Sequence, residues 1–254
     1  MKLLLAMFLS CFIAGNVTAQ NKTQEDQFKL LSYNVQHCMG QDGLINYDRI
    51  ASIITQVNPD VVCLQEIDSV NGRCEDIDQM KVLGEKTKMH HFFSASIPFM
   101  GGKYGIGILS KKEPISVKRI NLPGEEPRSA LAVEFDSYVV IGTHLDLEEA
   151  NRASSVQLLT DLALSYNKKV FLAGDFNETD LKGGFFSEML KNWKLASTQQ
   201  KTYPTGNPVE LLDLIFTLNG YSYQLIQSEA IYTLPNVDVS NASDHYPIYS
   251  LFKK

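Results

Sequence analysis

The sequence predicts an α/β fold in which two mixed β-sheets pack face to face with helices on their outer faces. A strand–helix–strand segment near the N-terminus has the pattern of a parallel βαβ unit, and a later strand–turn–strand segment has that of an antiparallel hairpin. The 254 residues, 44% of them hydrophobic, can bury a sizeable core, and no linker-like or low-complexity run divides them. Both kinds of strand pairing in one undivided chain favour a single domain with mixed sheets.

The N-terminal βαβ unit begins with a strand over 28–35. A helix follows the capping residue Asn46, and the nearly apolar segment 60–66 is the next strand. A crossover connection returns the chain parallel to its start, so Asn34 and Glu66 should lie at the same edge of neighbouring strands. Open α/β sheets usually bind ligands at that edge.

The hairpin comprises strands 130–135 and 138–144, which a tight turn at Asp136-Ser137 joins. Further strands are expected at 105–110, 169–173, 212–217, 223–227 and 248–252, and helices at 148–164 and 185–193.

The turn Gly174-Asp175-Phe176-Asn177 is the strongest local signal for chemistry. Asp175 could orient and deprotonate a water molecule, and Asn177 could donate a hydrogen bond to a pentavalent phosphorane. The alternative is a turn that Asp and Asn side chains cap for structural reasons alone.

A second polar segment, Ser243-Asp244-His245-Tyr246-Pro247, precedes the last strand. Asp244 could bind a cation and His245 a phosphate, although neighbouring residues of an extended strand point oppositely and a kink would be needed to aim both inward. The alternative is a solvated Asp-His pair in a surface loop.

Several single residues are candidates as well. Asp213 lies in an apolar strand, so its carboxylate should be paired, and a histidine is the obvious partner. His144 ends a strand, and a histidine satisfied at the rim for structural reasons is its alternative. Arg128 begins a strand and could clamp a phosphate oxygen, and a surface salt bridge is its alternative. Tyr104 is a weaker candidate for substrate binding, and simple packing is its alternative.

The first residues predict export. Residues 1–19 have the pattern of a secretory signal that ends at an Ala-x-Ala-like site, 20–27 form a short linker, and 28–254 are the catalytic domain. The expected location is periplasmic or extracellular; lipid attachment at Cys11 is a minor alternative. The formal charge of −6 disfavours a protein that holds nucleic acid mainly by neutralising phosphates.

Three cysteines remain after removal of the signal. Cys38, Cys63 and Cys74 lack the spacing of a zinc site, and one disulfide plus a free thiol would be compatible with an oxidising compartment. Whether Cys63 and Cys74 pair is left open.

The ordered set of motifs resembles the endonuclease/exonuclease/phosphatase superfamily, which includes deoxyribonucleases, neutral sphingomyelinases and inositol polyphosphate phosphatases. The resemblance spans 28–252 and rests on the segments 32–34, 64–66, 104–110, 143–145, 174–177, 212–216 and 243–247. It implies a four-layered α/β sandwich and Mg²⁺-dependent phosphoester hydrolysis, with Mn²⁺ or Ca²⁺ as substitutes.

The resemblance also implies roles for these residues. Glu66 binds the metal, and Asn34 and Asp244 complete its surroundings. Apart from the resemblance, we expect Asn34, Arg128 and Tyr104 to face the substrate. Asp175 orients the attacking water, and Asn177 stabilises the transition state. His245, which Asp213 orients, polarises the phosphate, and His144 helps the leaving oxygen. Attack would be in line, without a covalent intermediate.

The sequence departs from the family pattern at two places. Gln36 replaces an acid that many relatives carry two residues after the first Asn, and residues 209–212 lack the Arg or Lys that often precedes the Asp. The second change weakens binding to a DNA backbone, so we expect an enzyme for a lipid or small-molecule phosphoester. We also expect a monomer without a stable protein partner. A secreted nuclease and a non-catalytic phospholigand-binding module are the alternatives.

Overall fold

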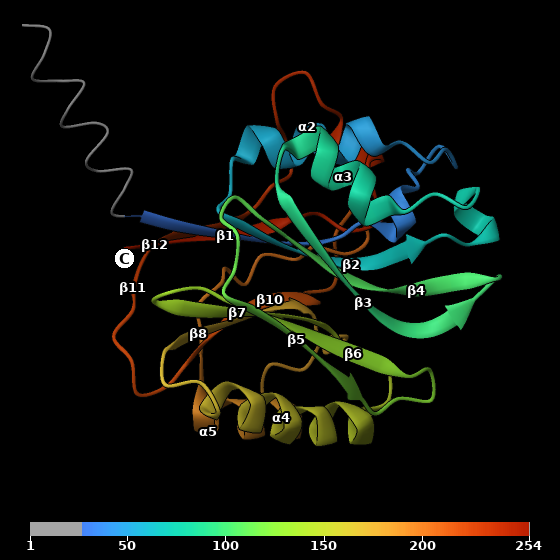
Figure 1. Cartoon of the computed structure of the whole chain (residues 1–254). Helices are drawn as coiled ribbons and strands as arrows, with labels where there is room; N and C mark the ends of the chain where they lie inside the picture. The colour runs from blue at the N-terminus through green and yellow to red at the C-terminus, as the bar shows by residue number, and fades with distance from the viewer. Residues whose placement is uncertain (1–26, 254) are drawn as a thin grey trace, which may run out of the picture.

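The computed structural model describes residues 27–253 (Figure 1). The signal expected at 1–19 lies outside the described residues. So does the linker expected at 20–27, except for its last residue, Gln27, which begins the first strand.

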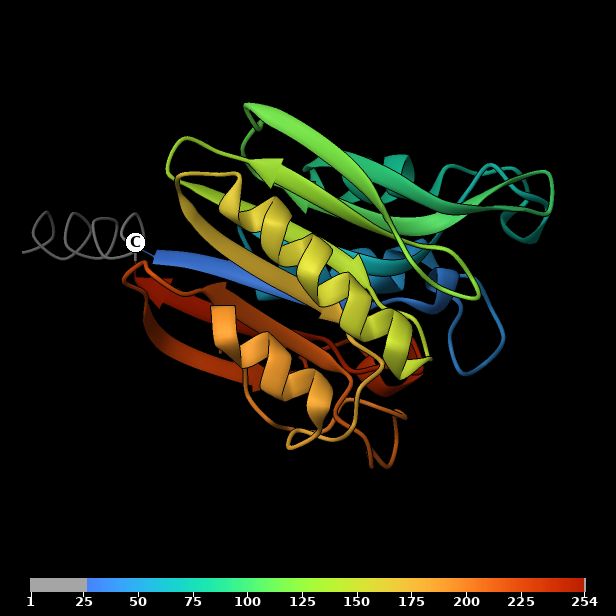
Figure 2. The same ribbon diagram turned by 90° about the horizontal axis from the view of Figure 1, so that it is seen from below.

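Two six-stranded sheets pack face to face, and helices cover the outer face of each (Figures 1 and 2). The first sheet has the order β11-β12-β1-β2-β4-β3. Its strands are β1 (Gln27–Asn34), β2 (Val61–Ser69), β3 (His90–Phe99), β4 (Gly102–Ser110), β11 (Gln224–Ala230) and β12 (Ile248–Lys253).

The second sheet has the order β5-β6-β7-β8-β10-β9. Its strands are β5 (Ser116–Leu122), β6 (Arg128–Glu134), β7 (Tyr138–His144), β8 (Lys169–Asp175), β9 (Trp193–Leu195) and β10 (Asp213–Leu218). In each sheet one pair is parallel, β1 with β2 and β7 with β8, and the other pairs are antiparallel. The predicted fold class, a four-layered sandwich with two mixed sheets, is confirmed.

The helices form the two outer layers (Figure 1). α2 (Tyr47–Val57) and α3 (Gln79–Thr87) cover the first sheet, and α4 (Glu149–Leu164) and α5 (Gly184–Asn192) cover the second. The expected cap of α2 is present, because the Asn46 side chain accepts a hydrogen bond from the Arg49 N–H. No helix among residues 27–253 is long and apolar enough to cross a membrane.

Alternation along the strands divides the apolar residues among three layers. In β1, Leu30 packs between the sheets while Leu31 packs against the helices. In β8, Ala173 packs between the sheets and Leu172 packs against the helices. Each fully buried aliphatic side chain contributes roughly 1.5–3 kcal/mol. The same alternation directs Asn34, which lies four residues after Leu30, into the space between the sheets.

The structure corrects several sequence predictions. The strand expected to end at Glu66 continues to Ser69, and α3, β3, β5 and β9 were not predicted. The possible disulfide is absent from the described residues, since Cys38, Cys63 and Cys74 are free and buried. The hairpin was predicted correctly: β6 and β7 are antiparallel, and the Phe135 N–H donates to the Tyr138 carbonyl at 2.8 Å.

Candidate active site

Polar residues of five strands meet at one edge of the inter-sheet space. They are Asn34 (β1), Glu66 (β2), His144 (β7), Asp175 (β8) and Asp213 (β10), and His245 joins them from the loop before β12. Asn34 and Asp175 belong to different sheets, and their side chains touch across the gap.

Asn34 links two carboxylates of the site, those of Glu66 and Asp175. Its Nδ2 donates to Glu66 Oε1 at 3.1 Å and to Asp175 Oδ2 at 3.0 Å. Its Oδ1 accepts the Gln36 N–H at 3.1 Å. The amide therefore orients both carboxylates as a donor, and its oxygen is occupied by the backbone. An amide oxygen has two lone pairs, so the role of Asn34 as a metal ligand stays a prediction.

Glu66 lies in a β-bulge. The register of β2 against β4 shifts between Leu64 and Ile67, and Glu66 has a φ of 60°. Leu64 and Ile67 are three residues apart, yet both pack on the helix-covered face, which an unbroken strand does not allow. The extra residue brings the Glu66 carboxylate to Asn34, and the left-handed backbone of a non-glycine residue is a strain that is typical of functional sites.

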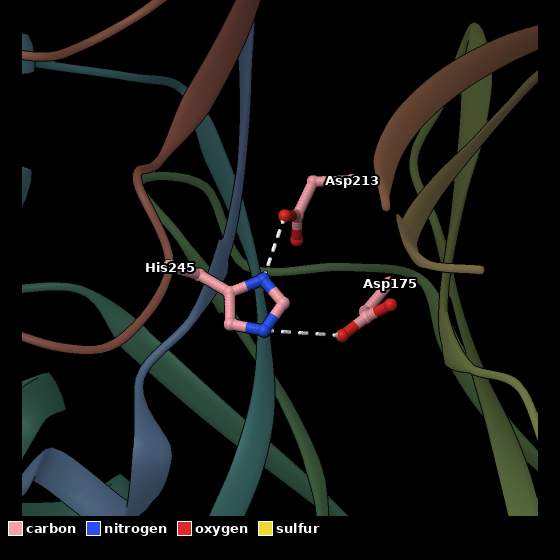
Figure 3. A group of neighbouring side chains, drawn as sticks. All are labelled: Asp175, Asp213 and His245. Carbon is pink, nitrogen blue, oxygen red and sulfur yellow. Dashed lines mark hydrogen bonds and ion pairs between the residues drawn. The ribbon is translucent and has the colours of Figure 1, made fainter. Parts of the chain in front are cut away.

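His245 is held between two aspartates (Figure 3). Its Nδ1 lies 2.9 Å from Asp213 Oδ2, and its Nε2 lies 3.7 Å from Asp175 Oδ2. Thr202 Oγ1 also donates to Asp213 Oδ2, at 2.6 Å. The expected histidine partner of Asp213 is thus present.

The environment of His245 favours the imidazolium. Burial disfavours the charged ring, but Asp213 and, less strongly, Asp175 and Asp244 outweigh it and raise the pKa of His245 to about 10. The ring is therefore charged at neutral pH, and its Nε2–H can bind a phosphate oxygen.

The kink required to aim both Asp244 and His245 is present as a bend at these two residues. Ser243 fixes it: its Oγ donates to the Asn34 carbonyl at 2.8 Å and accepts the His245 N–H at 3.4 Å. The loop before β12 is thereby attached to the end of β1.

Asp175 is surrounded by groups that favour its carboxylate. Burial would raise its pKa, but His144, His245 and the hydrogen bond from Asn34 hold the pKa of Asp175 below its ordinary value. The Asn177 N–H donates to Asp175 Oδ1 at 2.9 Å, so the self-capped turn considered from the sequence also forms. One carboxyl oxygen caps the turn, and the other, Oδ2, faces the site.

His144 and Asn177 contact each other. The Asn177 Nδ2 donates to the Leu145 carbonyl at 2.8 Å and lies 3.1 Å from His144 Nε2. Burial lowers the pKa of His144 to about 4, so its ring is neutral at neutral pH. A neutral ring whose Nε2 accepts from Asn177 has no proton there to give in this arrangement, and the role of His144 in assisting the leaving oxygen stays a prediction.

Arg128 and Tyr104 lie at the margin of the site. Arg128 is only 7% exposed; its Nη1 pairs with Glu126 Oε2 at 3.0 Å, and its Nε has no hydrogen-bond partner in the described part of the chain. Burial and the neighbouring Glu66 raise the pKa of Tyr104 well above its ordinary value, so the phenol stays protonated and can donate. Both side chains offer donors, as substrate binding requires.

The carboxylates of Glu66 and Asp244 fit a hard divalent cation. Burial raises the pKa of Glu66, and the charges of Asp244 and Asp175 raise it further; burial also raises the pKa of Asp244. A cation with a preference for oxygen ligands would relieve this repulsion. Asp175, Asp213 and His245 also lie within 4.8 Å of one another, but the 2.9 Å contact of Asp213 with His245 already occupies both groups. Glu66 and Asp244 are therefore the better ligand pair.

Sequence reasoning missed residues that support the site from a distance. Thr202 lies in a loop without a recognisable pattern, and nothing in the sequence links it to Asp213. Arg152 and Glu178 form a buried ion pair beside Asn177. A charged residue on the otherwise uncharged buried face of the predicted helix 148–164 is a signal that could have found Arg152.

Comparisons with known proteins show the family and the fold of the chain. The Endonuclease/Exonuclease/phosphatase family matches residues 31–245. A search of curated proteins found no match. Among solved structures, an endonuclease/exonuclease/phosphatase from Beutenbergia cavernae has a TM-score of 0.72 at 19% identity, over 90% of this chain and 72% of that one.

Two further solved structures have the same fold. A mannosyl-6-phosphatase from Bacteroides thetaiotaomicron has a TM-score of 0.72 at 15% identity, over 89% of this chain and 100% of that one. ANGEL2, a 2′,3′-cyclic phosphatase, has a TM-score of 0.68 at 13% identity, over 89% of this chain and 95% of that one. On the family match over residues 31–245, the chain belongs to the Endonuclease/Exonuclease/phosphatase family.

Proposed function

We propose that this protein is an exported, Mg²⁺-dependent hydrolase of lipid or small-molecule phosphoesters. Members of the family are phosphoester hydrolases and generally use divalent metals. One observation carries the proposal: Asp175 Oδ2 is 3.0 Å from Asn34 Nδ2 and 3.7 Å from both His245 Nε2 and His144 Nε2. A buried carboxylate beside a charged imidazole is the pair that water activation on a phosphate requires.

Each residue has a step in this mechanism. Asp175, ionised because its pKa is low, orients the water and accepts its proton as attack proceeds. The His245 imidazolium donates through Nε2 to a phosphate oxygen while Asp213 holds the ring at Nδ1. The Asn177 Nδ2 has two N–H groups, and one of them can donate to a phosphate oxygen only when that oxygen takes the place of His144 Nε2 as the acceptor. Glu66 and Asp244 would hold the Mg²⁺, which supplies positive charge to the phosphoryl group; Mn²⁺ or Ca²⁺ could substitute.

The charges near the site favour a small substrate over duplex DNA. The ring of Tyr203 lies 4.8 Å from that of His245, and Tyr203 pairs with Glu210, within the segment 209–212 that lacks a basic residue. The lack of a basic side chain in this segment removes a contact that would hold a polyanionic backbone. The solved mannosyl-6-phosphatase is a relative whose name states a sugar phosphate, and it motivates sugar phosphates as probes.

A substrate panel tests the proposal. Purified protein would be incubated with Mg²⁺ and sugar phosphates, inositol phosphates, sphingomyelin vesicles or plasmid, with EDTA and the Asp175→Asn variant as controls. We expect hydrolysis of at least one lipid or small substrate that both controls abolish. Cleavage of plasmid alone would make the protein a nuclease, and binding without turnover would make it a phospholigand-binding module.

Export requires its own test. Expression of the full chain in a bacterial host, followed by mass measurement of the protein outside the cytoplasm, should give a chain that begins at Gln20. A chain that keeps residues 1–19 and stays in the cytoplasm would contradict export, and a lipid adduct on Cys11 would show anchoring instead.

A further inference from the structure

A buried ion pair lies outside the group of residues that would contact substrate. Arg152 Nη2, on α4, is 3.0 Å from Glu178 Oε2, in the loop after β8, and each residue is only 7% exposed. Neither residue is in the motifs that indicated the site. Removing two charges from water is costly, and apolar side chains of similar size often stabilise a fold equally well. A contribution to the stability of the fold is thus a weak explanation for the presence of this buried ion pair.

The pair joins the loop that follows His144 to the loop that carries Asn177. Arg152 Nη1 donates to the carbonyls of Asp146 and Leu147, in the loop that follows His144. Glu178 directly follows Asn177, and its second oxygen, Oε1, accepts the Asp180 N–H at 2.9 Å. One guanidinium therefore binds both loops, and its planar fork fixes their distance and direction.

The connection continues to the reacting groups. Asn177 Nδ2 donates to the Leu145 carbonyl, so the amide of one loop is bonded to the backbone of the other. A relative shift of the loops would change this bond and the 3.1 Å contact of Asn177 with His144. Asn177 has a φ of 49°, a left-handed conformation that its neighbours must maintain.

We propose that Arg152 and Glu178 are positioning residues that place the Asn177 amide for the transition state. This inference rests on the proposed function. A group that acts on the transition state must be held within a fraction of an ångström, and misplacement by about 1 Å can cost roughly 100-fold in rate. Loss of the pair should therefore lower kcat and leave KM nearly unchanged.

The test compares two isosteric variants. Glu178→Gln removes the charge beside Asn177. Glu134→Gln is the control, because it removes the charge of a more exposed ion pair on the second sheet, Lys168 Nζ with Glu134 Oε1 at 2.6 Å. We expect Glu178→Gln to lower kcat roughly 10- to 100-fold with KM within about threefold, and Glu134→Gln to leave both within about twofold. Equal kcat for the two variants would overturn the proposal.

A double-mutant cycle shows whether Glu178 acts through Asn177. If it does, Glu178→Gln should have little further effect on kcat in the Asn177→Ala background. Independent effects that multiply would overturn the proposal. If Asn177→Ala itself leaves turnover unchanged, the assignment of Asn177 to catalysis fails instead.

A structural measurement covers the cases in which a variant folds poorly or no substrate is found. The side-chain amide signal of Asn177, identified in ¹⁵N NMR spectra by its loss in Asn177→Ala, should exchange faster with water in Glu178→Gln than in Glu134→Gln. Arg152→Met combined with Glu178→Gln removes both charges, leaves no unpaired one, and should give the same result. An unchanged amide signal in a folded variant would overturn the proposal, whatever the activity.

Discussion

Asp175 and His245 have opposite charges because of where they lie. Both are buried, yet Asn34 and the neighbouring rings keep the carboxylate ionised, and Asp213 keeps His245 protonated. Their types and order were predicted from the sequence. Their protonation was not, because it depends on desolvation and on partners that are up to 141 residues away.

The loss of the Asp175 carboxylate should abolish most activity. Asp175→Asn keeps the size and the turn but cannot accept a proton, so we expect kcat to fall by roughly two orders of magnitude or more, as is usual for a general base. Steady-state kinetics on the best substrate of the panel measures this. Asp161→Asn, on the exposed side of α4, is the control and should match the wild type. Similar rates for both variants would refute the role of Asp175.

His37 should make the protein less stable in acid. Burial, with a smaller contribution from Arg73, lowers its pKa to about 4 from an ordinary 6.5, so the folded state disfavours the proton that the unfolded chain binds. The free energy of unfolding should therefore fall between about pH 6.5 and pH 4, by up to roughly 3 kcal/mol from this residue. Urea denaturation at several pH values measures the slope.

His37→Gln should make that slope shallower. His144 has a similarly lowered pKa, so part of the pH dependence will remain in the variant. A variant whose stability falls as steeply as that of the wild type would contradict the assignment.

Most of the candidate site residues that the sequence indicated lie at the ends of strands. In the structure, alternation along β1, β8 and β10 directs Asn34, Asp175 and Asp213 between the sheets. The bulge at Glu66 could not be predicted, since it depends on how β2 pairs with β4. β5 was missed because it is a largely exposed edge strand, and α3 because only four of its nine residues are buried.

Gly174 is required for the close approach of β8 to β7. A Cβ at this position would lie 2.0 Å from the Thr143 carbonyl oxygen. Because this oxygen belongs to the backbone of β7, it cannot shift easily to relieve the clash. Gly174→Ala should therefore destabilise the fold by roughly 1–3 kcal/mol and lower kcat by displacing Asp175. Thermal unfolding and kinetics measure the two effects.

Gly184→Ala is the control for this substitution. Its Cβ would meet only Glu149 Oε1, at 3.5 Å, which is an ordinary contact. The prediction fails if the two alanine variants are equally stable and active.

At the scale of the whole molecule, the described residues contain three free, buried cysteines, and two of them lie in different layers of the core. Cys38 packs under α2, and Cys63 lies between the sheets. Burial raises the pKa of both thiols above the ordinary value. A buried thiol with a raised pKa is unreactive.

Thiol titration should show this burial. The native protein should react slowly, and the denatured exported chain should give three thiols without reductant; a chain that retains Cys11 should give four. Only one reactive thiol in the denatured exported chain would indicate a disulfide and contradict the packing described for these residues.

The sequence by itself determined the fold class, the order of the motifs and the strand ends at which polar residues occur, because alternation and turn chemistry are local properties. Only the tertiary structure decided that Asn34 binds two carboxylates as a donor, that Glu66 enters the site through a bulge, that His144 is neutral while His245 is charged, and that Arg152 joins two loops. These properties depend on strand pairing, burial and contacts between residues that are distant in the chain, and no local pattern encodes them.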